Sequence, residues 1–152
     1  MKPEMIILEN SIRLLEYWGF VLRAGSPMNH NYLWLKVCYD NPREDTTAYQ
    51  TRWYGIPYMP SDWLNRDLHP TERKVFSRCI RSLADDGLVV TVARWGTRTS
   101  HFELTPKGLV QAIRLFPSDS DPLDFEAIVL ALQHCKWATA EHIAAVPQEV
   151  SQ

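Results

Sequence analysis

Hydrophobic residues recur at helical spacing near both ends of the chain. The pattern between residues 5 and 24 predicts an amphipathic N-terminal helix, with Leu8, Ile12, Leu15 and Leu22 on one side. Residues 123–146 repeat the pattern and predict a C-terminal helix, or two helices with a bend near residues 137–139. The C-terminal apolar stripe consists of Phe125, Ile128, Val129, Leu132 and Cys135.

A third amphipathic helix is expected over residues Pro70–Asp85. Gly87 ends it, because glycine readily takes the left-handed conformation just after a helix. The residues expected on its apolar side are Val75, Phe76, Cys79, Ile80 and Leu83. The opposite side carries Lys74, Ser77, Arg78 and Arg81, flanked by Arg73 and Ser82. A solvated helix face usually mixes charges of both signs, so this cationic stripe is typical of a helix that faces a polyanion.

A β-hairpin and a further helix follow. Residues Leu88–Arg94 and Thr99–Leu104 are two extended runs, the first rich in β-branched residues, joined by a turn at residues 95–98. Thr105 as N-cap and Pro106 at the first helical position then predict a helix that ends near residue 116.

The segment before the cationic helix is less regular. Residues Tyr32–Tyr39 are expected to form a helix, and Ser61–Leu68 a short helix with Ser61 as N-cap. Residues 41–60 read as a long structureless loop with several aromatic side chains. Either the aromatic residues pin this loop to the body of the protein, or they form a stacking surface for bases or a ligand.

The charge distribution supports a local polyanion-binding surface. Residues 65–114 carry nine Lys/Arg and five Asp/Glu, a local charge of +4. The remainder carries seven bases and thirteen acids, −6, which together give the net charge of −2. A basic region in an otherwise acidic chain indicates a localised nucleic-acid contact rather than general attraction to polyanions.

The motifs SRCIRSLADDGLV and FELTPKG, within a stretch of about 40 residues, resemble those of bacterial winged helix-turn-helix regulators. They are especially similar to those of the multiple-antibiotic-resistance regulator (MarR) and phenolic-acid regulator (PadR) groups. The resemblance implies a mainly α fold with a small β-hairpin wing, that is, an α+β winged helix-turn-helix with extra N- and C-terminal helices. It places the winged-helix core at about residues 59–116 of a single domain spanning 1–152. The helix at Pro70–Asp85 would be the recognition helix, and residues 94–99 the tip of the wing.

We therefore expect a sequence-specific protein that binds double-stranded DNA, acts as a transcriptional regulator and forms a homodimer through its terminal helices. The terminal helices could equally cover the core of one chain. Base contacts are expected from Lys74, Ser77, Arg78 and Arg81, and phosphate contacts from Thr71 and Arg73. Arg94 and Arg98 would reach the DNA from the wing, while Trp95 braces the hairpin. The alternatives are a winged-helix adaptor that binds another protein, and the DNA-binding module of a replication or mobile-element protein.

Other classes of protein find little support. Cys38, Cys79 and Cys135 are isolated, which argues against a disulfide framework and favours a reducing cytoplasm. The group of His134, Cys135, Glu141 and His142 lacks recognisable zinc-site spacing, so we expect structural histidines, no metal and no cofactor. The chain contains no GxSxG, GxxxxGK[ST] or GxGxxG motif, which argues against an enzyme. No apolar run approaches the ~20 residues that span a bilayer.

Overall fold

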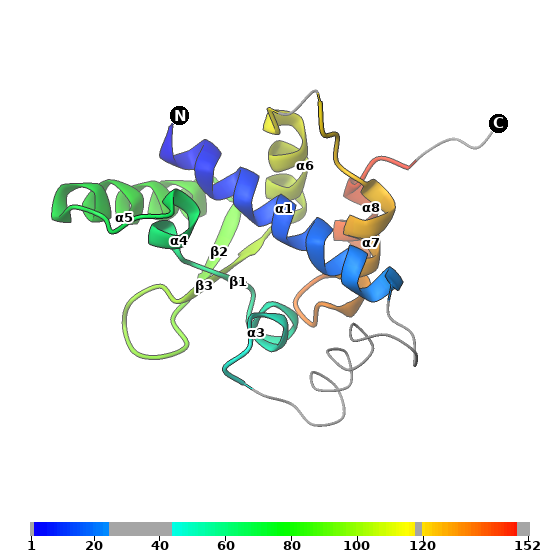
Figure 1. Ribbon diagram of the computed structural model, residues 1–152, viewed down its shortest axis with the longest axis horizontal. Helices are drawn as coiled ribbons and strands as arrows, with labels where there is room; N and C mark the ends of the chain where they lie inside the picture. The colour runs from blue at the N-terminus through cyan, green and yellow to red at the C-terminus, as the bar shows by residue number, and fades with distance from the viewer. Residues whose placement is uncertain (1, 25–43, 118–119, 149–152) are drawn as a thin grey trace.

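A computed structural model describes residues 2–24, 44–117 and 120–148. Within these residues the protein is mostly helical with one small antiparallel sheet, an α+β arrangement (Figure 1). The helices are α1 (Pro3–Ala24), α3 (Thr47–Trp53), α4 (Pro60–Leu64), α5 (Pro70–Asp85), α6 (Pro106–Leu115), α7 (Phe125–His134) and α8 (Ala140–Ala145), and the strands are β1 (Ile56–Pro57), β2 (Val89–Val92) and β3 (His101–Leu104). The helix expected at Tyr32–Tyr39 lies outside the described residues. None of the described helices is long and apolar enough to cross a membrane.

The sheet has the strand order β1–β3–β2, with both neighbouring pairs antiparallel. β3 is the central strand: Phe102 lies opposite Ile56 of β1 and opposite Thr91 of β2. The hairpin was expected from the sequence, but both strands are shorter than predicted, so the connecting loop spans residues 93–100 instead of four residues. The third strand, β1, was not expected.

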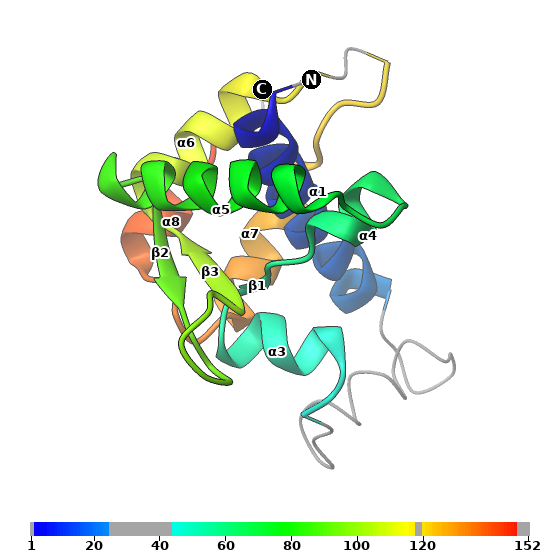
Figure 2. The same ribbon diagram turned by 90° about the vertical axis from the view of Figure 1, so that its left-hand side faces the viewer.

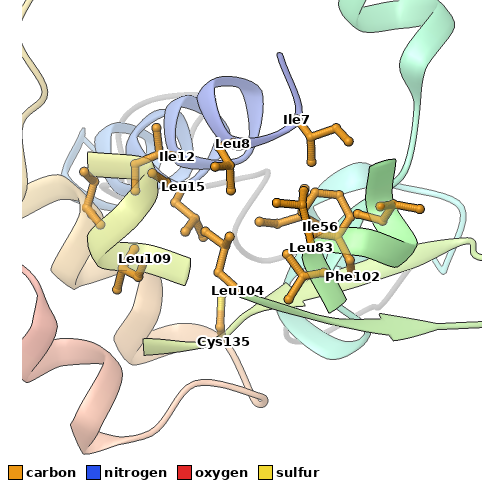
Figure 3. Close-up of a cluster of buried hydrophobic side chains, with 14 of the residues drawn as sticks. Ile7, Leu8, Ile12, Leu15, Ile56, Leu83, Phe102, Leu104, Leu109 and Cys135 are labelled. Carbon is orange, nitrogen blue, oxygen red and sulfur yellow. The ribbon is translucent and has the colours of Figure 1, made fainter. Parts of the chain in front are cut away.

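Helix α1 forms the centre of the molecule and packs against α5, α6 and α7. Figure 3 shows Ile7, Leu8, Ile12 and Leu15 of α1 pointing toward a layer that includes Phe102 and Leu104 of β3. All of these side chains are at least 99% buried. The N-terminal apolar stripe predicted from the sequence is thus the middle of the core, with Ile7 added and Leu22 only half-buried.

The C-terminal segment forms two helices, which confirms the alternative with a bend. α7 ends at His134, and residues 135–139 turn the chain before α8. The bend is held to α3, because the Lys136 amide donates to the Arg52 carbonyl at 2.8 Å and the Trp137 indole N–H donates to the Thr51 carbonyl at 2.9 Å. Ile128 and Leu132 of the predicted stripe are buried, so within one chain α7 covers the core.

Charged side chains also join α1 to the start of α7. Glu16 is buried, pairs with Arg13 one turn earlier, and accepts the Asp124 N–H at 2.6 Å. Arg23 pairs with the Asp124 carboxylate, which also caps α7 by accepting the Ala127 N–H at 3.0 Å. The hydrogen bonds from Arg23 are the main cause that lowers the pKa of Asp124. These contacts cross about a hundred residues of sequence, so helical periodicity alone did not reveal them.

Two predictions for residues 41–68 were wrong. Residues 44–60 do not form a structureless loop, since they contain α3 and β1. The helix predicted at Ser61–Leu68 begins at Pro60 with Met59 as N-cap, and the left-handed Asn65 (φ 55°) ends it. Proline is favoured at the first helical position, and asparagine tolerates the left-handed region, which explains both ends of the short helix.

Candidate nucleic-acid interface

Helix α5 begins with a cap formed by the side chain of Glu72. Glu72 accepts the His69 backbone N–H at 3.1 Å, and Arg66 donates to both carboxylate oxygens of Glu72 at 2.8 and 2.6 Å. The hydrogen bonds from Arg66, followed by the one from His69, lower the pKa of Glu72 to about 2. The acidic residue in the first turn is therefore paired with Arg66, a cation that precedes the helix.

The buried side of α5 consists of Phe76, Ile80 and Leu83, with Cys79 half-buried. Val75 was expected on this side, but 42% of it is exposed. It lies about 100° around the helix from Phe76, which places it at the border of the apolar stripe. The rest of the predicted pattern is confirmed.

The polar side of α5 is open to solvent. All six residues predicted to contact DNA from this helix are exposed: Thr71, Arg73, Lys74, Ser77, Arg78 and Arg81. Among the described residues, none of the four cations in this set pairs with a carboxylate. The Arg73 backbone N–H is used within the helix, donating to the His69 carbonyl at 3.0 Å, so Arg73 offers an anion only its guanidinium.

The β2–β3 loop, residues 93–100, lies below α5 at the far end of the hairpin, on the same side of the molecule (Figures 1 and 2). In Figure 2 this face points toward the viewer, with α5 running across it and the hairpin below. The loop is closed at its base, because the Ser100 N–H donates to the Val92 carbonyl and the Ser100 hydroxyl accepts the Arg94 N–H at 2.8 Å. Arg94, Trp95 and Arg98 are all exposed on this loop.

The two arginines of the loop differ in their contacts. The Arg94 guanidinium carbon lies 4.4 Å from the centre of the Tyr54 ring, and its Nη2 donates to the Tyr54 hydroxyl at 3.3 Å. Arg94 is therefore held against the residue that follows α3. Arg98 makes no such contact with the described part of the chain. The sequence placed both on the hairpin but could not reveal the contact with Tyr54, which lies 40 residues earlier.

His101 supports the loop from below. The residue is fully buried, with Nδ1 2.8 Å from the Ser100 hydroxyl and Nε2 3.0 Å from the side-chain oxygen of Gln50. Because an amide oxygen can only accept, Nε2 carries a proton. Burial, and secondly the charge of Arg94, lower the pKa of His101. Trp95 braces the hairpin as expected, with its ring 5.0 Å from that of His101, yet 66% of Trp95 remains exposed.

The hairpin and the next helix are anchored to the end of α5. Gly87 takes the expected left-handed conformation, with φ 75°. Thr105 caps α6 as predicted by accepting the Gly108 N–H at 3.0 Å, and its hydroxyl lies 2.7 Å from the Gly87 carbonyl oxygen. The Thr105 N–H donates to the Leu88 carbonyl at 3.1 Å. The Leu-Thr-Pro-Lys-Gly segment thus fixes the direction of β3 relative to α5.

The histidines near the C-terminus make structural hydrogen bonds. His134 Nδ1 lies 2.9 Å from the Leu130 carbonyl oxygen of its own helix. His142 is buried, donates from Nε2 to the Leu104 carbonyl at 2.8 Å and accepts the Thr139 N–H at Nδ1. No group of three or more potential metal ligands occurs within the residues that the structure describes.

The chain was compared with known protein families, with curated proteins and with solved structures, and none of the three comparisons found a match.

Proposed function

We propose that the protein binds double-stranded DNA as a sequence-specific regulator of transcription, through a winged helix-turn-helix made of α4, α5 and the β2–β3 hairpin. The observation that carries the proposal is the exposed side of α5. Four cations face solvent there without a carboxylate partner in the described chain, and a loop on the same side of the molecule adds Arg94 and Arg98. Phosphates of nucleic acids are the natural counter-charge for such a surface.

The dimensions of α5 suit the major groove. Sixteen residues make a helix of about 24 Å, and with side chains its diameter of ~10–12 Å matches a groove about 12 Å wide. α4, a turn and α5 give the helix-turn-helix order, in which the second helix enters the groove. Lys74, Ser77, Arg78 and Arg81 would then contact base edges, and Thr71 and Arg73 the phosphates.

The hairpin would supply the wing of the same module. The loop that carries Arg94 and Arg98 lies on the same side of the molecule as α5, so the loop and the helix can approach one duplex (Figure 2). A homodimer would present two such faces and recognise two half-sites about one helical turn, ~34 Å, apart. The alternative function, an adaptor for another protein, would gain support if the apolar stripe of the C-terminal helix were uncovered and no dimer formed. Ile128 and Leu132 of that stripe are buried within the chain itself, which favours the DNA-binding proposal.

The test is binding of the full chain to labelled duplex DNA, measured by fluorescence anisotropy at several salt concentrations. At a selected site, Arg78→Ala or Arg81→Ala should each weaken binding by about 1–3 kcal/mol and relax specificity. Arg98→Ala should weaken binding to all sequences equally and lower the log–log salt slope by about one. Arg114→Ala is the matched control, because Arg114 is an exposed arginine on α6, outside both α5 and the loop.

Binding by the Arg78 and Arg81 variants equal to that of the parent would show that α5 does not contact DNA. Absence of binding by the folded parent at low salt would refute the proposal as a whole.

A further inference from the structure

Five rings form a continuous row from the end of α3 to the β2–β3 loop. We call this set the aromatic row: Trp53, Tyr49, Tyr54, His101 and Trp95. Successive ring centres are 6.2, 5.8, 5.5 and 5.0 Å apart, within the range of contacting aromatic side chains. The row joins residues separated by more than 40 positions in the sequence, so only the folded chain creates it.

The rings in the middle of the row pack inside the protein, whereas the rings at its two ends are exposed to solvent. Tyr49 and Tyr54 are half-buried and His101 is fully buried. Trp53 and Trp95 are 45% and 66% exposed, and both rank among the large hydrophobic side chains left in water. Burial of a tryptophan ring is strongly favourable, so two half-exposed rings at the ends of one row indicate a surface that something else covers.

Cations accompany the exposed ring of Trp53 and the middle of the row. The Lys136 ammonium lies 5.4 Å from the centre of the Trp53 ring, and the Arg52 guanidinium 5.3 Å from it. Arg94 lies over Tyr54. The nearby acids, Glu44 and Asp45, precede the N-terminus of α3, whereas Trp53 is its last residue. Burial, the neighbouring Tyr54 and the charge of Glu44 together raise the pKa of Tyr49, so one acid does act on the middle of the row. The surface thus combines exposed π faces with positive charge, which matches bases and phosphates respectively.

The position of the row relative to α5 points to the form of nucleic acid. In both ribbon views the β2–β3 loop lies below α5 and beside α3 (Figures 1 and 2). An unpaired strand that continues from a duplex held by α5 and the loop would therefore pass close to Trp95 and Trp53. Bases in a duplex are stacked on each other, so only an unpaired strand can offer base faces to these rings.

We infer that the aromatic row binds unpaired nucleotides that continue from the duplex, with Trp95 and Trp53 stacking on the bases and Lys136 and Arg94 facing the phosphates. The inference rests on the proposed duplex contact for the place where the unpaired strand begins. Stacking of bases on the two tryptophan rings does not depend on that contact. The protein would accordingly prefer a junction of double-stranded and single-stranded DNA to a blunt duplex.

The experiment compares three labelled probes with the full chain by fluorescence anisotropy. The first is a blunt duplex of about 20 base pairs, two helical turns. The second is the same duplex with an overhang of about six dT nucleotides, placed on the 5′ or the 3′ end. The third is the dT strand alone. Because one stacked base contributes a factor of about five or more, the overhang of suitable polarity should increase affinity at least about five-fold over the blunt duplex.

Two variants remove the rings but keep apolar bulk: Trp95→Leu and Trp53→Leu. Trp53→Leu should reduce or abolish the gain from the overhang and leave binding to the blunt duplex unchanged. Trp95→Leu should reduce the gain relative to its own affinity for the blunt duplex, because Trp95 also braces the loop, while Trp95→Phe retains part of the gain. Phe20→Leu is the matched control, since Phe20 is 42% exposed on α1, outside the row. Trp95 is 66% exposed and Trp53 45% exposed, and neither belongs to the buried core, so the variants should fold, which far-UV circular dichroism checks.

Equal affinity for the blunt and overhanging duplexes, or a gain that survives both leucine substitutions, would overturn the inference while the duplex proposal stands. If neither the parent nor any variant binds the blunt duplex, the duplex proposal fails. Binding of the single-stranded dT probe then tests the inference by itself. Binding of that strand by the parent, lost in Trp95→Leu and Trp53→Leu, supports the aromatic row, and unchanged or absent binding refutes it.

Discussion

Replacement of Gly108 by alanine tests how α6 is attached to the end of α5. Gly108 lies in the first turn of α6 and has ordinary helical backbone geometry, so local considerations favour alanine by about 1 kcal/mol. The tertiary structure predicts the opposite sign. A β-carbon at this position would lie 1.8 Å from the Leu88 carbonyl oxygen, far inside van der Waals contact with a backbone atom that cannot rotate away.

The magnitude follows from what must move. To clear the clash, the first turn of α6 has to shift by more than 1 Å, which stretches the hydrogen bonds that Thr105 makes to Leu88 and Gly87. Overpacking strain costs about 1–3 kcal/mol, and each weakened hydrogen bond about 0.5–1.5 kcal/mol. After subtraction of the gain in helix propensity, Gly108→Ala should lower the free energy of unfolding by about 1–5 kcal/mol.

Urea denaturation followed by far-UV circular dichroism measures this change. Val110→Ala is the control in the same helix: Val110 is 48% exposed, and its variant should lie within about 0.5 kcal/mol of the parent. An unchanged m-value would show that the Gly108→Ala variant still unfolds from a comparably compact state. A Gly108→Ala protein as stable as the parent would refute the close approach of α6 to Leu88, and with it the fixed relation between α5 and the hairpin.

Two further predictions concern pH. The pKa of Glu72 in the folded protein, about 2, lies below the ordinary value of 4.5, so the stabilisation it provides is present above pH 4.5 and disappears as the pH falls toward 2. Glu72→Gln should therefore lower the melting temperature at pH 7 but much less at pH 2, and equal losses at both values would contradict this pairing. The pKa of His101 is also lowered, so the folded protein disfavours protonation of this imidazole. The stability that depends on neutral His101 is therefore lost as the pH falls below about 6.5. His101→Phe cannot be protonated, so its urea midpoint should fall less than that of the parent between pH 7.5 and 5.5; an identical fall in both proteins would show that His101 does not cause it.

The cationic side of α5 was predictable because it depends on local information. A helix has a fixed angular spacing, so the sequence alone separates Phe76, Ile80 and Leu83 from Arg78 and Arg81. Val75 shows the limit of this reasoning. Periodicity gives the direction of a side chain but not the width of the surface against which the helix packs.

The short elements were not predictable in the same way. β1 has two residues and pairs with β3, more than 40 positions later, and it owes its strand conformation to that partner. Tyr58 of the same segment packs with Trp63, and burial raises its pKa to about 12. The aromatic residues of this region are thus divided. Tyr58 pins the chain to the core, which agrees with the interpretation that the aromatic residues hold this segment to the body of the protein. Trp53 remains half-exposed.

The sequence by itself determined the elements whose signals are local: the amphipathic helices, the glycine after α5, and the Thr-Pro start of α6. Each depends on side-chain spacing or backbone preference within a few residues, and each is present in the structure. The tertiary structure alone decided that α5 and the β2–β3 loop share one face, that Glu72 is paired with Arg66 and that the aromatic row exists. These features join residues from different elements, and their positions depend on how α1 and the sheet pack around one core, which no local pattern specifies.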